Sequence, residues 1–293
     1  MTLLAILFAL FTERVWTGVG RFRSFSWFDH LIVRQRNIRG GTGRGPLGII
    51  LITLLPLLAV AVLQTMLYAI LPVLSWVFAA AVLLYSLGPR DLDREVHAFL
   101  NAWEQGDEVN ALEYAQRIHL STGVSFHAAS PERSVVEGVL VAAHERWFAV
   151  IFWFMVLGSP GALWFRLAAL LRERCLNDAS GEDFREAAMA MHRILGWIPA
   201  RLTLLTYALA GSFADTFEAL RNEAYHWRSD WTANNEQLLI HGGLGALQLE
   251  QELKTDDVEP STRHVRAALG LTLRTLIIAV AVTAVGNLGA WAA

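Results

Sequence analysis

The feature that most constrains this chain is a stretch of 41 residues, 47–87, that contains no charged side chain. A single helix of that length would be about 60 Å long, at about 1.5 Å per residue. The hydrocarbon core of a bilayer is only about 30 Å thick. The stretch therefore has to turn back on itself, and we expect a membrane hairpin. The expected place of the turn is Gln64–Thr65 or the region of Pro72.

The composition agrees with a chain that is only partly embedded in a membrane. Apolar residues make up 54% of the 293 residues and charged residues 17%, and the net charge is −3. No strand pattern is present, so we predict an all-α, polytopic integral membrane protein with a soluble helical hairpin between its membrane segments. The near-neutral charge offers no field for a polyanion, and no nucleic-acid partner is expected. Cys175 is the single cysteine, which excludes an intrachain disulfide.

Alternation between apolar and polar stretches divides the chain into five parts. A loop near the N-terminus holds six arginines between Arg21 and Arg44, and such loops stay on the cytoplasmic side. The predicted parts are an N-terminal membrane part (1–90, with a span at 2–19, the basic loop and the hairpin 47–87), a soluble helical hairpin (91–133), a membrane or interfacial core with broken helices (134–213), amphipathic soluble helices with a linker (214–268) and a C-terminal transmembrane helix (269–293).

The soluble hairpin is predicted from two amphipathic helices that meet at Gly106–Asp107. Apolar residues recur in both at helical spacing, so one face of each helix is expected to pack against the other. The two faces are Val96, Phe99, Leu100 and Trp103 in the first helix, and Val109, Leu112, Ala115 and Ile118 in the second.

Proline and glycine place two interruptions in the core part. A helix that begins at Ser130–Pro131 is expected to end at "GSPG", where Gly158, Pro160 and Gly161 form a structural break. If the chain crossed the membrane fully here, the arginines that follow would lie outside, against the positive-inside tendency. We therefore favour a re-entrant turn or a tilted, partly inserted segment.

The second interruption is Pro199, which precedes another apolar run. Proline is well tolerated in the first turn of a helix, so we expect Pro199 to begin this helix and Arg201 to lie in its first turn. Arg166 and Arg201 both stand in apolar contexts, where a central charge costs roughly 2.5–3.5 kcal/mol on insertion scales. Together they could clamp a phosphate or carboxylate. Alternatively, each anchors a helix end or pairs with an internal acid.

Glu137 and His144 are seven residues apart and share a helix face, whereas Glu145 is displaced by about 100°. Such a pair could relay protons or hold a metal, but two ligand-type residues are too few for a metal site. Solvated or ion-paired side chains are the alternative, and we predict no metal site. No H-x-x-x-H, G-x-S-x-G or dinucleotide-binding pattern is present.

The order of these parts is similar to that of a known group of membrane proteins. The segments "VEGVLVAAHERWFAVIFWFMVLGSPGALWFRLAALL" and "HRILGWIPARLTLLTYALAGSF" resemble AmpE, the family of membrane proteins in bacterial β-lactamase regulation. AmpE belongs to the same superfamily as the CobD/CbiB cobinamide-phosphate synthases. The resemblance covers nearly the whole chain. It is strongest over 134–213, and "WIPARL" is its most specific motif.

Several positions depart from the pattern of the synthases. They carry A-E-N-x-x-D-G where this chain has "LVAAHER" (140–146), in which only Glu145 falls near the acidic position. Their N-T-L-D run is "ALLR" (169–172) here, and His192–Arg193 stand where they carry acids. Their Gly-Asp-Pro is Gly18–Val19–Gly20 here. Because Mg²⁺ prefers hard oxygen ligands, we interpret the loss of these acids as a retained scaffold with its nucleotide chemistry lost.

On this interpretation the resemblance implies a non-catalytic regulatory protein of the bacterial inner membrane, linked to β-lactamase induction, cell-wall recycling and antibiotic resistance. It implies no cofactor and no catalytic residue. The expected partners are membrane lipids and either a cell-wall-derived small molecule or a regulatory protein, and the oligomeric state stays open. The alternatives are an ATP-dependent amide-forming synthase that uses a phosphorylated amino alcohol and Mg²⁺, and a transporter of an anionic solute. The candidate binding residues are Glu137, His144, Arg166, Pro199 and Arg201.

Overall fold

The computed structural model describes residues 2–15, 25–36, 46–87, 92–122, 126–127, 130–177, 182–223, 235–249 and 262–292. Every regular element in these ranges is a helix, which confirms the predicted all-α fold. Within the described ranges, three helical runs are long and apolar enough to cross a membrane: Pro46–Ile70, Pro131–Leu157 and Thr262–Gly286. The chain is therefore a helical membrane protein.

The helices form two compact units, each built from segments that are distant in the sequence. Unit 1 contains Met1–Arg90 and Ala149–Leu195, and unit 2 contains Asp91–Phe148 and Gly196–Ala293. The boundaries between the units at Phe148–Ala149 and at Leu195–Gly196 lie within continuous helical runs, and the third boundary, at Arg90–Asp91, lies outside the described residues.

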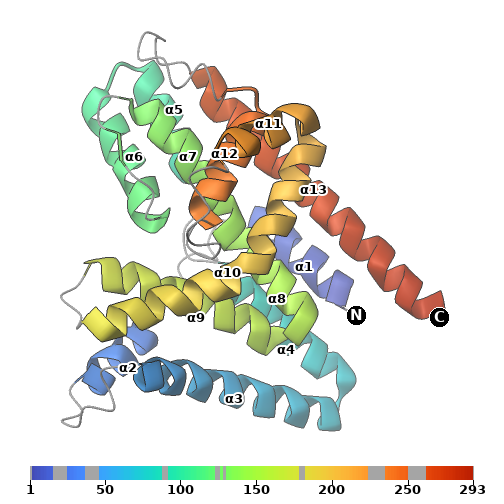
Figure 1. Cartoon of the computed structure of the whole chain (residues 1–293). Coiled ribbons are helices and arrows are strands. Elements are labelled where there is room, and N and C mark those ends of the chain that lie inside the picture. The colour runs from blue at the N-terminus through green and yellow to red at the C-terminus, as the bar shows by residue number, and fades with distance from the viewer. Residues whose placement is uncertain are drawn as a thin grey trace. The chain divides into compact units, whose positions relative to one another are not determined.

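Unit 1 is a bundle in which the apolar hairpin packs against the helices around the glycine–proline break (Figure 1). Its core contains Phe28, Ile52, Leu167 and Phe184. The outer face of the hairpin exposes many large apolar side chains, as expected where lipid is the solvent. Its elements are α1 (Thr2–Val15), α2 (Ser26–Arg36), α3 (Pro46–Ile70), α4 (Pro72–Ser86), α8 (Ala149–Leu157), α9 (Ser159–Asn177) and the first half of α10 (Glu182–Ala210).

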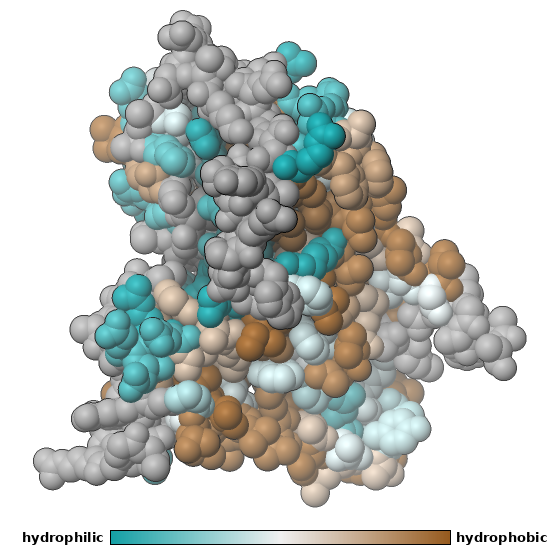
Figure 2. Space-filling model, viewed as in Figure 1, coloured by the Kyte–Doolittle hydropathy of each residue, from teal (hydrophilic) through white to brown (hydrophobic). Residues whose placement is uncertain are grey.

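The apolar hairpin turns at Leu71, immediately before Pro72. Leu71 is extended, with φ −153° and ψ 120°, because the ring of a following proline disfavours the helical conformation. Of the two expected turn positions, the structure uses the one at Pro72. Gln64 stays inside α3, where it hydrogen-bonds Ser159. Hydrophobic side chains cover the region of α3 in Figure 2.

The expected basic loop contains a helix, α2, whose apolar positions repeat at helical spacing. Phe28 and Ile32 of α2 are buried in the core of unit 1, and Asp29 accepts a hydrogen bond of 2.7 Å from Arg174 of α9. The arginines of the loop outside α2, and residues 16–19 of the expected first span, lie outside the described residues.

The break at "GSPG" is a sharp corner between α8 and α9. Gly158 has φ +69°, a conformation that L side chains rarely adopt, and the next residue begins α9. Gly161 lies against α8 so closely that an added Cβ would be 2.3 Å from the carbonyl oxygen of Trp153. The two helices therefore pack directly on each other through the glycine.

Unit 2 has its own core, which includes Phe99, Ile118, Leu140 and Tyr207. The buried helix α7 lies at its centre and contacts α5, α6, α12 and α13. The elements are α5 (Leu92–Glu104), α6 (Glu108–Thr122), α7 (Pro131–Ala143), a π-helix (His144–Phe148), the second half of α10, α11 (Phe213–Glu223), α12 (Asn235–Ala246) and α13 (Thr262–Ala292). The expected linker at 251–261 lies outside the described residues.

The helical hairpin of α5 and α6 follows the predicted pattern except at one position. Val96, Phe99 and Leu100 are buried on α5, and Ala115 and Ile118 are buried on α6. Val109 was expected on the inner face but is 80% exposed. The inner face of α6 instead begins at Ala111, which shares a helix side with Ala115 and Ile118.

Asp107 caps α6 and supplies a first testable prediction. Its carboxylate accepts hydrogen bonds from the Asn110 side-chain amide at 2.6 Å and from the Asn110 backbone N–H at 3.2 Å. These bonds lower the pKa of Asp107 below its ordinary value of 3.8. Because the folded-state pKa is lowered, the ionised Asp107 stabilises the folded protein at pH values above the ordinary pKa of 3.8. This contribution is lost as the pH falls through the folded-state pKa. We therefore expect Asp107→Ala to lower the thermal unfolding temperature at pH 7.

The same measurement at acidic pH provides the control for this prediction. Below the folded-state pKa the wild-type carboxylate is protonated, so the difference between wild type and Asp107→Ala should shrink. A difference that stays constant between neutral and acidic pH would contradict the role of the ionised carboxylate.

The helix α10 shows that one prediction was wrong. Pro199 does not begin a helix, because α10 starts at Glu182 and continues through Pro199 to Ala210. Arg201 accordingly lies deep inside the helix and not in its first turn. Proline cannot donate to the carbonyl four residues earlier, which is that of Leu195. The indole N–H of Trp153 donates to this carbonyl at 2.9 Å, so the missing bond is replaced.

Candidate functional site in unit 2

A π-helix interrupts the helical run Pro131–Leu157 in its second half. It has the sequence "HERWF" (144–148), and His144, Glu145 and Arg146 are all buried. π-Helical turns are rare and frequently occur at functional sites. Ionisable side chains inside a candidate membrane span are costly and usually functional. This coincidence makes the π-helix the centre of the candidate site.

His144 is held by the second half of α10. Its Nδ1 lies 3.0 Å from the hydroxyl oxygen of Thr203, and that hydroxyl donates to the carbonyl of Pro199 at 2.9 Å. Gly196 lies near Nε2 of His144, since a Cβ added to Gly196 would be 3.9 Å from this nitrogen. The same Cβ would be 3.3 Å from the side-chain amide nitrogen of Asn235. Thus the "GWIPARLT" segment and the start of α12 surround the imidazole.

Arg201 lies in the same neighbourhood and is half-buried. Its guanidinium donates to the side-chain oxygen of Asn235 at 2.8 Å and to the carbonyl of Trp197 at 2.9 Å. It also stacks over the ring of Trp197, with 4.3 Å between the guanidinium carbon and the ring centroid. These contacts fix Arg201 inside unit 2.

Tyr207 supports the transition from α7 to the π-helix. The backbone N–H of His144 donates to the carbonyl of Val141, three residues earlier, whereas a regular α-helix bonds residues four apart. The buried hydroxyl of Tyr207 donates to the Leu140 carbonyl at 2.8 Å. On the other side Arg146 reaches Glu95 of α5 at 3.3 Å. The irregular turn is therefore held from both α10 and α5.

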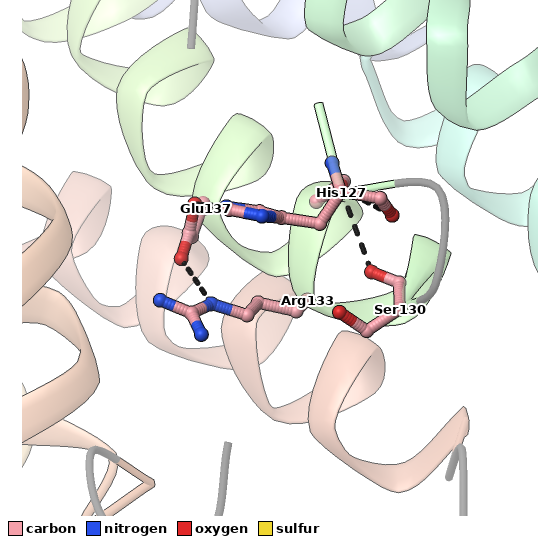
Figure 3. A network of polar contacts seen from close by, with 5 residues as sticks. His127, Ser130, Arg133 and Glu137 are labelled. Atoms are coloured by element: carbon pink, nitrogen blue, oxygen red, sulfur yellow. Dashed lines mark hydrogen bonds and ion pairs between the residues drawn. The ribbon is translucent and has the colours of Figure 1, made fainter. Parts of the chain in front are cut away.

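Glu137 lies two turns before His144, on α7, in a polar network shown in Figure 3. Its side chain is only 4% exposed. Arg133 donates to one carboxylate oxygen at 2.8 Å, and His127 Nε2 lies 3.8 Å from the other. Of the alternatives for Glu137, the structure shows the ion-paired one. His144 is buried and bonded to Thr203, so it is not solvated.

Arg166 belongs to unit 1, whereas Glu137, His144, Pro199 and Arg201 belong to unit 2. Within unit 1 Arg166 is buried, and its guanidinium lies 5.7 Å from the centroid of the Phe25 ring. The site described for unit 2 is thus built without Arg166.

Sequence reasoning missed Thr203, Asn235, Tyr207 and Glu95 as members of the site. Threonine, asparagine and tyrosine at these positions have no special spacing, and their partners are 34 to 67 residues away. One signal was available: three consecutive ionisable residues, His144 to Arg146, between two apolar runs. Among the described residues no group of three or more His, Cys, Asp or Glu side chains could hold a metal ion.

Comparison with known proteins decides the family. The profile described as "CobD/Cbib protein" matches residues 6–237, which is most of the chain. The chain belongs to the CobD/CbiB family. The match includes the π-helix, the "WIPARL" motif and Asn235. No solved structure matches the chain.

Two curated relatives carry the same name, "Cobalamin biosynthesis protein CobD". The protein from Chromobacterium violaceum is 33% identical over 198 residues, which cover 65% of this chain and 60% of the relative. The protein from Stutzerimonas stutzeri is 29% identical over 182 residues, which cover 62% of this chain and 59% of the relative. The match thus spans about 60% of the length of these relatives.

These relatives correct the function expected from the sequence. The expectation of a non-catalytic regulator, and with it the link to β-lactamase induction, cell-wall recycling and antibiotic resistance, was wrong. The superfamily was right, but the choice of AmpE within it has no support. The error arose because the missing acids were taken to exclude nucleotide chemistry. Mg²⁺ often uses only one or two carboxylates together with the phosphates of its substrate.

Proposed function

We propose that this CobD/CbiB-family member acts in cobalamin biosynthesis as an ATP-dependent synthase. It joins the amine of a phosphorylated amino alcohol to a corrinoid carboxyl group in an amide bond. The observation that carries the proposal is the family match over 6–237 together with the names of the two relatives. The proposal places the protein in the bacterial inner membrane with several crossings, in agreement with the three long apolar helices found among the described residues.

The buried polar groups of unit 2 support this function. Amide formation needs groups that orient a phosphorylated amine and accept its proton, in a place from which water is excluded. Unit 2 offers a buried carboxylate at Glu137, a buried imidazole at His144 and a fixed guanidinium at Arg201. In this proposal Glu137 binds or orients the amine.

The nucleotide and its Mg²⁺ are substrates that the reaction requires. The described residues provide no cluster of three or more ligands for a divalent ion. A dedicated protein cage is therefore not part of the proposal, and no step is assigned to the metal. Any protein ligands would have to act together with the phosphates of the nucleotide.

The test uses the full-length protein purified in a mild detergent. It is incubated with a corrinoid carboxylic acid, aminopropanol phosphate, ATP and Mg²⁺. We expect a product whose mass is that of the two substrates joined with loss of water, detected by mass spectrometry, and only when ATP is present. No such product at any substrate concentration, from protein whose helical fold is verified by circular dichroism, would refute the proposed function.

Removing the charge of Glu137 tests its place in this reaction. We expect Glu137→Gln to lower the rate of amide formation by about 100-fold, the size of the loss that a misplaced reactant can cause. The matched control is Glu113→Gln, since Glu113 also pairs with an arginine four residues away, Arg117, but on an exposed face. The control should keep the wild-type rate. Equal rates for both variants would exclude Glu137 from the site.

A further inference from the structure

Unit 1 contains a cavity near the turn of the apolar hairpin. Its volume is about 490 Å³, and small-ligand sites have volumes of about 300–1,000 Å³. It is lined by the start of α1, the second half of α3, the first turns of α4 and the region where α8 meets α9. All of these lining residues belong to unit 1, so the cavity is formed within one compact body.

The lining is mostly apolar, and none of the described residues that form it is charged. Its polar groups are uncharged: the amide of Gln64 and the hydroxyls of Tyr68, Ser75 and Ser159. ATP and a phosphorylated amino alcohol carry charges that such a lining cannot pair, and an unpaired charge is costly away from water. The cavity therefore suits a ligand that is largely apolar and has a hydrogen-bonding oxygen.

Gln64 offers a hydrogen-bond donor to the cavity. Ser159 is fully buried, and its hydroxyl donates to the side-chain oxygen of Gln64. This bond leaves the amide nitrogen of Gln64 with two hydrogens. Among the described residues the structure gives these hydrogens no acceptor. An amide donor without an acceptor is costly away from water, so an acceptor oxygen in the cavity would be stabilising.

Ser75 lies on the cavity wall, one turn after the hairpin turn, and is 6% exposed. Thr53 and Ser86 of the same hairpin donate their hydroxyl hydrogens to backbone carbonyls four residues earlier, each at 2.8 Å. No such bond is found for the Ser75 hydroxyl within the described ranges. A second buried polar group thus remains available to a ligand in the cavity.

The length of α3 places the cavity near one boundary of the hydrocarbon core. α3 begins at Pro46, two residues after Arg44, the last charged residue before the apolar hairpin. Gln64 follows 18 residues later, which is about 27 Å along a helix. The hydrocarbon core is about 30 Å thick. Tyr68 and Trp76 line the same cavity, and these residue types are enriched at membrane boundaries. The acyl ester groups of phospholipids lie at this depth.

We propose that this cavity binds one acyl chain of a diacyl phospholipid, whose ester carbonyl accepts a hydrogen bond from the Gln64 amide. Tyr68 and Val73 line the cavity and are 65% and 71% exposed, so it opens to the lipid-facing surface of the hairpin. The Ser75 hydroxyl is the second donor near the ester. This inference does not rest on the proposed synthase function, and a protein without amide-forming activity would still bind the lipid.

The hydrogen bond is tested with two lipids that differ only in their chain linkage. Full-length protein is stripped of lipid in detergent and incubated with dioleoyl phosphatidylglycerol or its dialkyl ether analogue, which lacks the carbonyl oxygen. Bound lipid is measured by native mass spectrometry. We expect the ester lipid to bind about twofold to tenfold more tightly, the contribution of one hydrogen bond. Gln64→Leu should abolish this preference. Equal binding of both lipids to the wild type would overturn the proposal.

Closing the opening of the cavity tests its position. Because Val73 is highly exposed, Val73→Trp can cover the opening without disturbing the core. The matched control is Val77→Trp, since Val77 is 50% exposed on the same helix and is not among the residues that line the cavity. We expect Val73→Trp to lose the bound lipid and the increase in thermal unfolding temperature that the lipid gives. The control should keep both. Equal lipid binding by the two variants would overturn this placement.

The headgroup is tested with phosphatidylglycerol and phosphatidylethanolamine that carry the same acyl chains. Since no described lining residue is charged, we expect the two dissociation constants to agree within about twofold, less than one hydrogen bond typically contributes. A preference of about tenfold or more for either lipid would show that a charged headgroup site retains the lipid, and the proposal would be wrong.

Discussion

Gly161→Ala is expected to prevent most of the protein from folding. The added Cβ would lie 2.3 Å from the carbonyl oxygen of Trp153 and 2.7 Å from the Cβ of Leu157. The first of these atoms belongs to the backbone of α8, so a side-chain rotation cannot relieve the contact. The corner between α8 and α9 would have to open, and we expect a cost of at least about 3 kcal/mol, the upper end for overpacking.

The measurement is the yield and thermal unfolding temperature of detergent-purified protein. Gly270→Ala is the matched control, because Gly270 also lies in an apolar helix and an added Cβ there meets nothing within 4 Å. This variant should be neutral or slightly stabilising, since alanine favours a helix more than glycine does. Wild-type yield and stability for Gly161→Ala would show that the close approach of α8 and α9 is absent.

Breaking the buried pair of Glu132 and His264 is the second change with a large expected effect. Glu132 Oε1 and His264 Nδ1 are 2.7 Å apart, and the two side chains are 7% and 10% exposed. The pair joins the N-terminal turns of α7 and α13 in unit 2. Glu132→Ala removes the acceptor from a buried imidazole and leaves a small cavity. Leaving a buried hydrogen-bonding group without its partner costs about 1–3 kcal/mol, so we expect a loss of this size.

An exposed ion pair that also involves a residue of α13 provides the control. Arg266 pairs with Glu104, and both side chains are about half exposed. Exposed pairs contribute about 0–1 kcal/mol, so Glu104→Ala should change the free energy of unfolding by less than about 1 kcal/mol. Both variants are compared by unfolding with urea in mild detergent. If Glu132→Ala lost no more stability than Glu104→Ala, the buried pair would not contribute in the way its geometry indicates.

The regulatory function expected from the sequence was wrong, because it was inferred from the absence of the acidic residues that the synthases carry. The departures at 140–146 and 169–172 are real differences from the synthase pattern. However, a magnesium–nucleotide site needs few protein carboxylates, since the phosphates supply most of the charge. The same stretch that lacks the expected acids contains His144, Glu145 and Arg146, which the structure buries in a π-helix. The loss of particular acids therefore did not justify excluding the chemistry of the family.

Part of the structure followed from the sequence alone. The charge-free stretch 47–87 required a turned-back apolar hairpin, because the length of a helix and the thickness of a bilayer are both fixed. The helical periodicity of 92–122 predicted most of the buried face of α5 and α6. The "GSPG" corner was predicted because glycine and proline act locally on the backbone.

Other features were decided only by tertiary structure. Pro199 could remain inside α10 because Trp153, distant in sequence, donates to the Leu195 carbonyl that the proline leaves without its helical donor. The surroundings of His144 come from Thr203 and from Gly196 with Asn235, which no local pattern connects to it. A sequence determines the periodicity and breaks of its helices, since these depend on neighbouring residues. Which distant donor satisfies a buried acceptor depends on how the helices pack, and only the folded chain determines that.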